Sequence, residues 1–171
     1  SDQSQEIESR EAMDAKLKQL EEKYQHQQTE HSNKVCDKNF INIFLAEEMD
    51  IILEAAGLLT NWEKTPHNHD IPAQLEKEVL AIASHAARAK IPEIEQLCNK
   101  LAECYQATLG HQLPADSVFF DTTRQSHDTL IDLMDKLAAH QPIEAVSDME
   151  EKLDSLLLAA APTADESEQK P

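Results

Sequence analysis

Apolar positions recur along this chain at intervals of three and four residues, the spacing that places side chains on one face of a helix. The first strong block covers about residues 40–63 and predicts a long core helix. The next block covers about 72–90 and predicts a second helix with one inward stripe. The expected inward positions are Phe40, Phe44, Ile51, Ile52, Ala55, Leu59 and Trp62 in the first helix, and Leu75, Val79, Ile82, Ala86 and Lys90 in the second.

Prolines and capping residues mark the starts of three further helices. Pro92 fits the first turn of a helix that Gly110 ends. Asp116 or Ser117 can cap the next helix, and Pro142 starts the last one. Five amphipathic helices joined by short links predict an all-α fold, an antiparallel up-down helical bundle. The inward positions expected in these three helices are Ile94, Leu97, Cys98, Leu101, Cys104, Tyr105 and Thr108, then Phe119, Phe120, Thr123, Leu130, Leu133, Met134 and Leu137, then Val146, Met149, Leu153 and Leu156.

The two ends of the chain differ in kind from the domain between them, residues 39–158. Residues 1–38 are strongly polar, and we expect a helix there that docks loosely or projects. Its few apolar positions indicate a short coiled-coil seam. We therefore expect the chain to be a monomer or to form a weak dimer through this helix. Residues 159–171 have nothing to bury and are expected to form a disordered linker, as in a piece of a longer protein. The apolar positions of the first segment are Ile7, Met13, Leu17, Leu20 and Tyr24.

The acidic charge of the chain narrows its range of partners. The 171 residues include 15 Lys and Arg against 33 Asp and Glu, a formal net charge of −18. Such a surface repels phosphate backbones and anionic lipids, so we expect neither nucleic-acid nor membrane binding. The sequence has no membrane-length apolar run and no signal-like start, which predicts a cytoplasmic location.

The composition also disfavours a β-sheet. The chain has only two glycines, and aromatic residues make up 4% of it.

The cysteines and a histidine-containing loop are interpreted as structural. Cys36, Cys98 and Cys104 are odd in number and lack a paired spacing, so we expect buried thiols without a disulfide. Residues 67–70, His-Asn-His-Asp, lie between prolines. Two histidines one residue apart could contact a divalent metal, but they lack a third fixed ligand, so we expect a solvated loop.

Neither the paired carboxylates nor His127 predicts catalysis. Glu47 and Glu48 are adjacent, so on a helix their side chains diverge by roughly 100° and cannot share a substrate. We therefore expect a solvated face there. His127 indicates helix packing or surface polarity. The sequence has no glycine-rich phosphate loop, and we expect no nucleotide site, metal or cofactor and no enzymatic activity of this chain itself.

Three segments in order resemble one known family. They are similar to the histidine-phosphotransfer domains of the chemotaxis-type kinases that control type IV pili and twitching motility, and the likeness covers about residues 39–158. The resemblance implies a bacterial two-component signalling module with a four-helix core plus additional helices, from a sensor histidine kinase or a related stand-alone protein. The similar segments are IFLAEEMDIILEAAGLLTNWE (43–63), AIASHAARAKIPEIEQLCNKL (81–101) and FFDTTRQSHDTLIDLMDKLAAHQPIEAVSDMEEKLDSL (119–156).

The phosphorelay motif of that family is replaced in this chain. In an ungapped register, Leu80 occupies the place of the phosphoaccepting histidine, Ala83 that of the adjacent lysine, and Ser84 and His85 those of paired glycines. Phosphoryl transfer needs a nucleophilic nitrogen and a nearby cation, and leucine and alanine supply neither. The resemblance therefore implies a degenerate module that works by protein–protein interaction. Its expected interaction face, turned outward on the helix, is formed by Lys77, Leu80, Ala81, Ser84, Ala87 and Arg88.

The partners that the resemblance implies are response-regulator receiver domains or neighbouring modules of the chemosensory kinase. Two alternatives stay open. His85 begins a His-x-x-cation-small pattern and could accept a phosphoryl group in a shifted register, as in an active phosphotransfer domain; otherwise it is a boundary histidine, wet or hydrogen-bonded locally. The second alternative is a structural helical spacer that oligomerises through residues 10–34.

Overall fold

The computed structural model describes residues 2–28 and 38–160, and these residues form six helices and no strands. The described chain is therefore all-α, as the apolar spacing predicted. None of its helices is both long enough and apolar enough to cross a membrane. Most of the predicted linker, residues 161–171, lies outside the described residues. The helices are α1 (Asp2–Gln28), α2 (Lys38–Lys64), α3 (Asp70–Arg88), α4 (Pro92–Leu109), α5 (Ser117–Ala138) and α6 (Ser147–Leu158).

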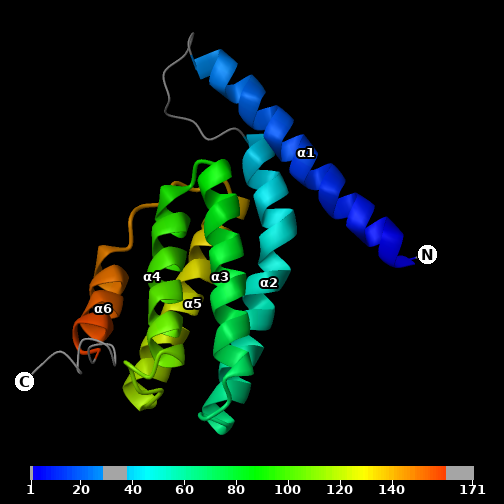
Figure 1. Cartoon of the computed structure of the whole chain (residues 1–171). Coiled ribbons are helices and arrows are strands. Elements are labelled where there is room, and N and C mark those ends of the chain that lie inside the picture. The colour runs from blue at the N-terminus through cyan, green and yellow to red at the C-terminus, as the bar shows by residue number, and fades with distance from the viewer. Residues whose placement is uncertain (1, 29–37, 161–171) are drawn as a thin grey trace, which may run out of the picture.

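Helices α2 to α5 form an antiparallel bundle (Figure 1). Each packs against the next, and α5 packs back against α2, so the four helices close a ring; the α3–α4 contact is the most extensive. Short links keep consecutive helices adjacent, which is why the connectivity runs up and down. Outside this ring, α6 packs against α4 and α5, and α1 crosses α2 and α3 near one end (Figure 1).

The core is built on the predicted inward positions and centres on aromatic rings. Trp62 is 1% exposed and packs edge-on against Phe119 and Phe120, with ring centroids 5.3 and 5.0 Å away. Its indole Nε1 donates a hydrogen bond of 3.3 Å to the carbonyl of Pro66, so the ring buries no unsatisfied polar atom. Each large apolar side chain that is buried in this way stabilises the fold by roughly 1.5–3 kcal/mol.

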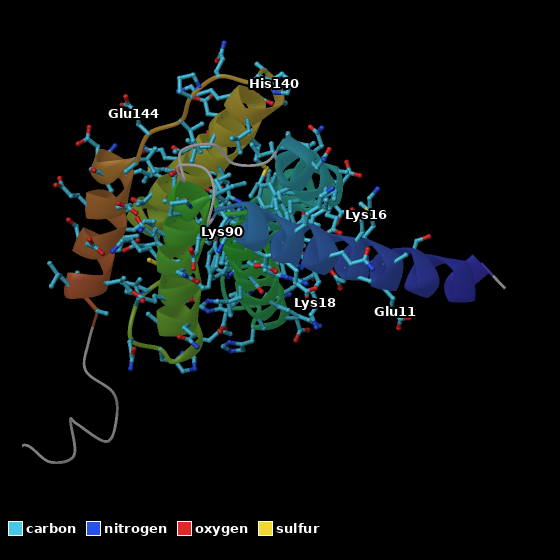
Figure 2. The ribbon with its side chains drawn as sticks, turned by 90° about the horizontal axis from the view of Figure 1, so that it is seen from above. Glu11, Lys16, Lys18, Lys90, His140 and Glu144 are labelled. Carbon is cyan, nitrogen blue, oxygen red and sulfur yellow. The ribbon has the colours of Figure 1, made fainter. Side chains whose placement is uncertain are left out.

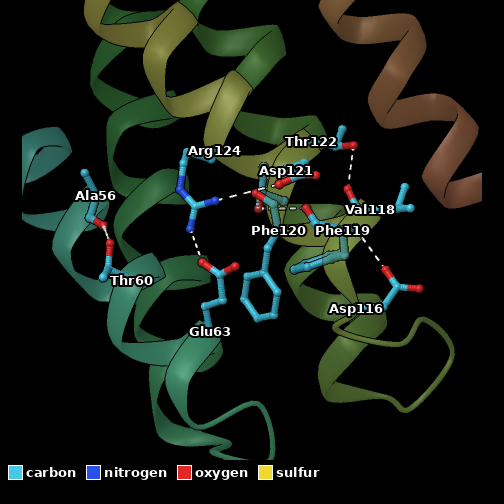
Figure 3. Close-up of polar contacts among 11 residues, drawn as sticks. Ala56, Thr60, Glu63, Asp116, Val118, Phe119, Phe120, Asp121, Thr122 and Arg124 are labelled. Carbon is cyan, nitrogen blue, oxygen red and sulfur yellow. Dashed lines mark hydrogen bonds and ion pairs between the residues drawn. The ribbon is translucent and has the colours of Figure 1, made fainter.

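The helix starts follow the predicted punctuation except at α6. Helix α4 begins at Pro92. Asp116 caps α5, where its carboxylate accepts a hydrogen bond of 3.0 Å from the backbone N–H of Phe119 (Figure 3). The prediction that Pro142 starts the last helix was wrong, because α6 begins at Ser147. Two acidic residues lie in the first turn of α6, and their charges favour a helix N-terminus at that point.

Three helices end on a non-glycine residue in the left-handed conformation. The φ angle is 63° at Lys90, 57° at His111 and 58° at His140, just after α3, α4 and α5. The amides there bond back to carbonyls of the last helical turn, a closure that usually uses glycine. Gly110 lies at the end of α4 as predicted, but its φ is −83°. Lys90 was wrongly predicted to face inward; it is exposed because α3 ends at Arg88.

A surface ion pair joins α2 to α5. Arg124 contacts the carboxylate of Glu63 and lies 3.9 Å from that of Asp121 (Figure 3). All three side chains are more than one third exposed, and ion pairs of this kind contribute only about 0–1 kcal/mol. The α2–α5 contact therefore depends mainly on the buried aromatic rings.

Helix α1 is attached to the bundle through the middle of its length. Leu17 is 1% exposed, and Met13 and Leu20 pack half-buried against the core. These predicted seam positions thus contact α2 and α3 of the same chain. The N-terminal part of α1 extends past the bundle (Figure 2). The side chains of Ile7 and Tyr24 lie outside the described residues.

Candidate functional site

The predicted interaction face lies on α3, on the side turned away from the core stripe. Leu80 at its centre is 43% exposed although it is a large apolar residue. Lys77 and Ser84 are also exposed, and the small side chains of Ala81 and Ala87 are half-buried. A large exposed apolar side chain among small neighbours allows another protein to approach the helix closely and to bury that side chain.

The sixth residue of this face, Arg88, is partly covered by α1. Its Nη1 lies 3.7 Å from Oδ1 of Asp14, and its Nη2 donates a hydrogen bond of 3.5 Å to the backbone carbonyl of Asp14. Leu80 lies about 12 Å from Arg88 along the helix axis. Helix α1 therefore contacts one end of the face, and the Leu80 end remains exposed.

His85, on the same helix, is held by acidic side chains of α2. Its Nδ1 forms a hydrogen-bonded ion pair with Oε1 of Glu48 and lies 3.7 Å from Oε2 of Glu47. The His85 side chain is 24% exposed, whereas Glu48 is fully buried. The hydrogen bond to Glu48 raises the pKa of His85 above its usual value, helped by the charges of Glu48, Glu47 and Asp14 and opposed by burial. The surroundings therefore favour the protonated imidazole.

The prediction of a solvated face at Glu47 and Glu48 was wrong. Both carboxylates approach one imidazole, because His85 of α3 lies opposite these two adjacent positions of α2. Burial raises the pKa of Glu47, and the charge of His85 acts in the opposite direction. Glu48 also falls between Phe44 and Ile52 at a spacing of four residues, and this position on the inward face was the sequence signal for its burial. His85 does lie at the core boundary, but its partner comes from α2 and not from its own helix.

The geometry limits what His85 can do chemically. Because Glu48 engages Nδ1, the nitrogen left for nucleophilic attack is Nε2, and a carboxylate on Nδ1 increases its basicity. A phosphoryl group would add negative charge to an imidazole that Glu47 and Glu48 already contact at Nδ1, and the Arg88 cation is paired with Asp14. Asp14, Glu47 and His85 place one ligand atom each within 4.8 Å of one another. This arrangement favours a cation over a phosphoryl group.

A second histidine, His127, is paired in apolar surroundings. Its Nε2 lies 2.6 Å from the hydroxyl oxygen of Tyr105, and both side chains are buried. Burial lowers the pKa of His127 to about 4 and raises that of Tyr105. The phenol therefore donates to a neutral imidazole, whose Nδ1 has no hydrogen-bond partner among the described residues. The expectation of helix packing at His127 is confirmed, and that of surface polarity was wrong.

The loop formed by residues 67–70 borders a hollow of about 580 Å³ at the end of the bundle. His67, His69 and His111 are among its lining residues, and the ring centroids of His69 and His111 are 5.4 Å apart. Asn68 Oδ1 accepts hydrogen bonds from two amides at the start of α3. His67 and His69 are exposed, as a solvated loop predicts.

Cys98 and Cys104 are buried free thiols, as predicted. Burial raises the pKa of Cys104 to about 12 and also raises that of Cys98. Thiols of such high pKa are poor nucleophiles at neutral pH, so neither cysteine is a candidate for catalysis. Cys36 lies outside the described residues.

No family model, no curated protein and no solved structure matches this chain. The likeness to phosphotransfer domains therefore rests on the three sequence segments quoted above.

Proposed function

We propose that this chain is a degenerate histidine-phosphotransfer-like module of a bacterial chemotaxis-type two-component system that controls type IV pili and twitching motility. It works in the cytoplasm by binding other proteins and catalyses no reaction itself. Its partners are receiver domains of response regulators or neighbouring modules of the chemosensory kinase. The docking function needs no cofactor. The chain acts as a monomer or as a weak dimer through its N-terminal helix.

The observation that carries this proposal is the exposure of Leu80. The side chain stands on α3 at the position where the resemblance places the phosphoacceptor, with the small residues Ala81 and Ser84 on its C-terminal side. A partner that recognises this helix face can therefore dock as it would on an active module, although no nucleophile meets it. Two exposed positions one turn from Leu80 also offer polar contacts at the rim: Lys77 and Ser84.

Substituting Leu80→Glu tests the docking surface. We expect the affinity for receiver domains of the same pilus system to fall at least about tenfold, since a buried apolar contact is replaced by a charge that must lose water. Calorimetric titration of purified domains measures the change, and circular dichroism checks that the fold is intact. Leu53→Glu is the matched control, because Leu53 is a leucine on α2 with 52% exposure. Equal affinities of the wild-type chain and Leu80→Glu would remove this face from the proposal.

A second function, active phosphotransfer through His85, is favoured by one observation: Glu48 fixes Nδ1 and leaves Nε2 as the basic nitrogen. Incubation with the system's kinase, ATP and receivers, followed by intact-mass measurement at neutral pH, separates the two functions. Addition of one phosphoryl group that disappears in His85→Gln would replace the docking proposal with a relay. No addition to the wild-type chain, but addition to Leu80→His, would support a lost nucleophile on a retained docking surface.

A further inference from the structure

The acidic cluster around His85 draws its members from three helices. Asp14 belongs to α1, Glu47 to α2 and His85 to α3, and one ligand atom of each lies within 4.8 Å of the others. Nδ1 of His85 and Oε2 of Glu47 are 3.7 Å apart. Two atoms bound to one first-row metal ion lie roughly 3–4 Å apart, because each bond is about 2.0–2.2 Å long. Small side-chain rotations would therefore bring the three ligands to one ion.

The buried carboxylate of Glu48 provides a second, independent observation at this cluster. The residue is fully buried, its Oε1 contacts the imidazole of His85, and its Oε2 has no hydrogen-bond partner among the described residues. An unsatisfied carboxylate oxygen in the interior is costly, and the charge makes it more so. Because Oε1 of the same carboxylate contacts His85, a metal ion bound at His85 would lie close to this carboxylate and offset its charge.

The formal charges of the cluster also favour a divalent ion. Three carboxylates, those of Asp14, Glu47 and Glu48, surround His85, and Arg88 pairs with Asp14. A protonated imidazole and one guanidinium leave this group with one excess negative charge. When a divalent ion takes the place of the imidazole proton, the group becomes neutral. One histidine nitrogen with carboxylate oxygens is a ligand set that suits Zn²⁺ and Mn²⁺.

We propose that Asp14, Glu47 and His85, beside the buried carboxylate of Glu48, form a binding site for a divalent first-row metal ion that fastens α1 to the bundle. The site differs from the docking face at Leu80 and does not depend on it. Apart from the ion, α1 is held by Leu17 and its half-buried neighbours and by the contact of Asp14 with Arg88. A metal bond to Asp14 would add a link between α1 and two other helices.

Titration of the full, EDTA-stripped chain with Zn²⁺ tests the site, with Co²⁺ absorption as a probe of ligand geometry. We expect one ion per chain and a Kd at least about tenfold higher in Asp14→Asn and in His85→Gln. Asp14 is an exposed side chain, so its substitution should leave the fold intact; circular dichroism checks both variants. The matched control is the double substitution of His67→Ala and His69→Ala in the exposed loop, which should leave the Kd unchanged. Binding weaker than about 100 μM, or binding that only the loop variant loses, would overturn the proposal.

Hydrogen exchange of the amides around Leu17 tests the clamp itself. Zn²⁺ should slow their exchange in the wild-type chain, since the ion ties Asp14 to α2 and α3, and should have no such effect in Asp14→Asn. Tight binding of Zn²⁺ with unchanged exchange in α1 would contradict a clamp and remove Asp14 from the ligand set.

Discussion

Two histidines in this bundle have opposite pKa shifts. His85, 24% exposed, lies between α2 and α3 with carboxylates around it, and its pKa is raised. His127, 1% exposed, lies against Tyr105, and its pKa is lowered to about 4. Burial disfavours the charged imidazole at both sites, but at His85 the hydrogen bond and charge of Glu48 outweigh it. The charge of the partner, and not the extent of burial alone, decides the protonation state.

The difference has a consequence for hydrogen bonding as well. Neutral His127 accepts a hydrogen bond at Nε2 from the Tyr105 hydroxyl, and a second proton would place a positive charge in a buried site. Protonated His85 donates from Nδ1 to the buried carboxylate of Glu48, and the charge of the imidazolium strengthens that hydrogen bond. Loss of the Nε2 proton would keep the bond but remove this charge from beside Glu48. Each histidine is therefore fixed in the state that its partner requires.

The largest expected effect is acid destabilisation through His127. Between pH 6.5 and about 4, the unfolded state binds a proton at this residue that the folded state refuses, so the free energy of unfolding falls as the pH is lowered through this range. The shift corresponds to about 3 kcal/mol, at about 1.4 kcal/mol per pH unit. Urea unfolding at a series of pH values measures the loss. His127→Gln, which keeps an acceptor for Tyr105 but does not titrate, should lack this component; an unchanged slope in that variant would refute the assignment.

The second effect is expected at the other histidine. Glu48→Gln keeps the shape of the side chain but removes its charge, so the pKa of His85 should fall and the free energy of unfolding should drop by about 2 kcal/mol. A raised pKa gives a stability contribution that is present below pH 6.5 and is lost as the pH rises through the folded-state pKa. The variant should therefore lose the decline of stability that the wild-type chain shows as the pH rises above 6.5. NMR titration of His85 in EDTA-containing buffer measures the pKa directly, and a pKa that does not move would contradict the role given to Glu48.

A third, smaller effect tests whether the phenol matters to His127. Tyr105→Phe removes the hydrogen bond to Nε2, and we expect the free energy of unfolding at pH 7 to fall by about 1 kcal/mol. The pKa of His127 should stay low, because burial lowers it and the substitution leaves the site buried. Thermal unfolding measures the loss of stability, and NMR titration measures the pKa of His127. A return of this pKa to the usual range would mean that Tyr105, and not burial, controls it.

The smallest effect comes from an exposed histidine that takes part in neither cluster. His140 has a φ of 58°, a left-handed conformation that glycine adopts without steric cost. His140→Gly should raise the free energy of unfolding by up to about 1 kcal/mol. His140→Ala is the control, since alanine has the same steric penalty and should bring no gain. Urea unfolding of the three proteins at one pH is sufficient.

Helix periodicity predicted most of the fold because burial on one face leaves a local signature in the sequence. Trp62, Leu75 and Phe119 lie in the core as their spacing required, and Asp116 caps its helix. The start of α6 was missed because Pro142 is compatible with a first helical turn but does not require one.

The candidate sites were only half predictable. Leu80 is exposed because it points away from the inward apolar stripe of α3. This direction follows from helical spacing, so the sequence was sufficient to predict the exposure. The cluster of Asp14, Glu47 and His85 depends on how three helices pack, and its members are 33 and 38 residues apart in the chain. Helical spacing gives no information on such contacts, and this is why the sequence did not predict the cluster.

The short connection between α3 and α4 has a consequence for the folding reaction. Only residues 89–91 separate these helices, and their mutual contact is the most extensive in the chain. A short loop loses little entropy on closure, whereas the Glu63–Arg124 pair that joins α2 to α5 closes a separation of 61 residues. We expect the α3–α4 hairpin to be largely formed in the folding transition state, with high φ-values at Leu97 and lower ones at Phe119. The helix that carries the docking face would then be one of the first parts of the molecule to take shape.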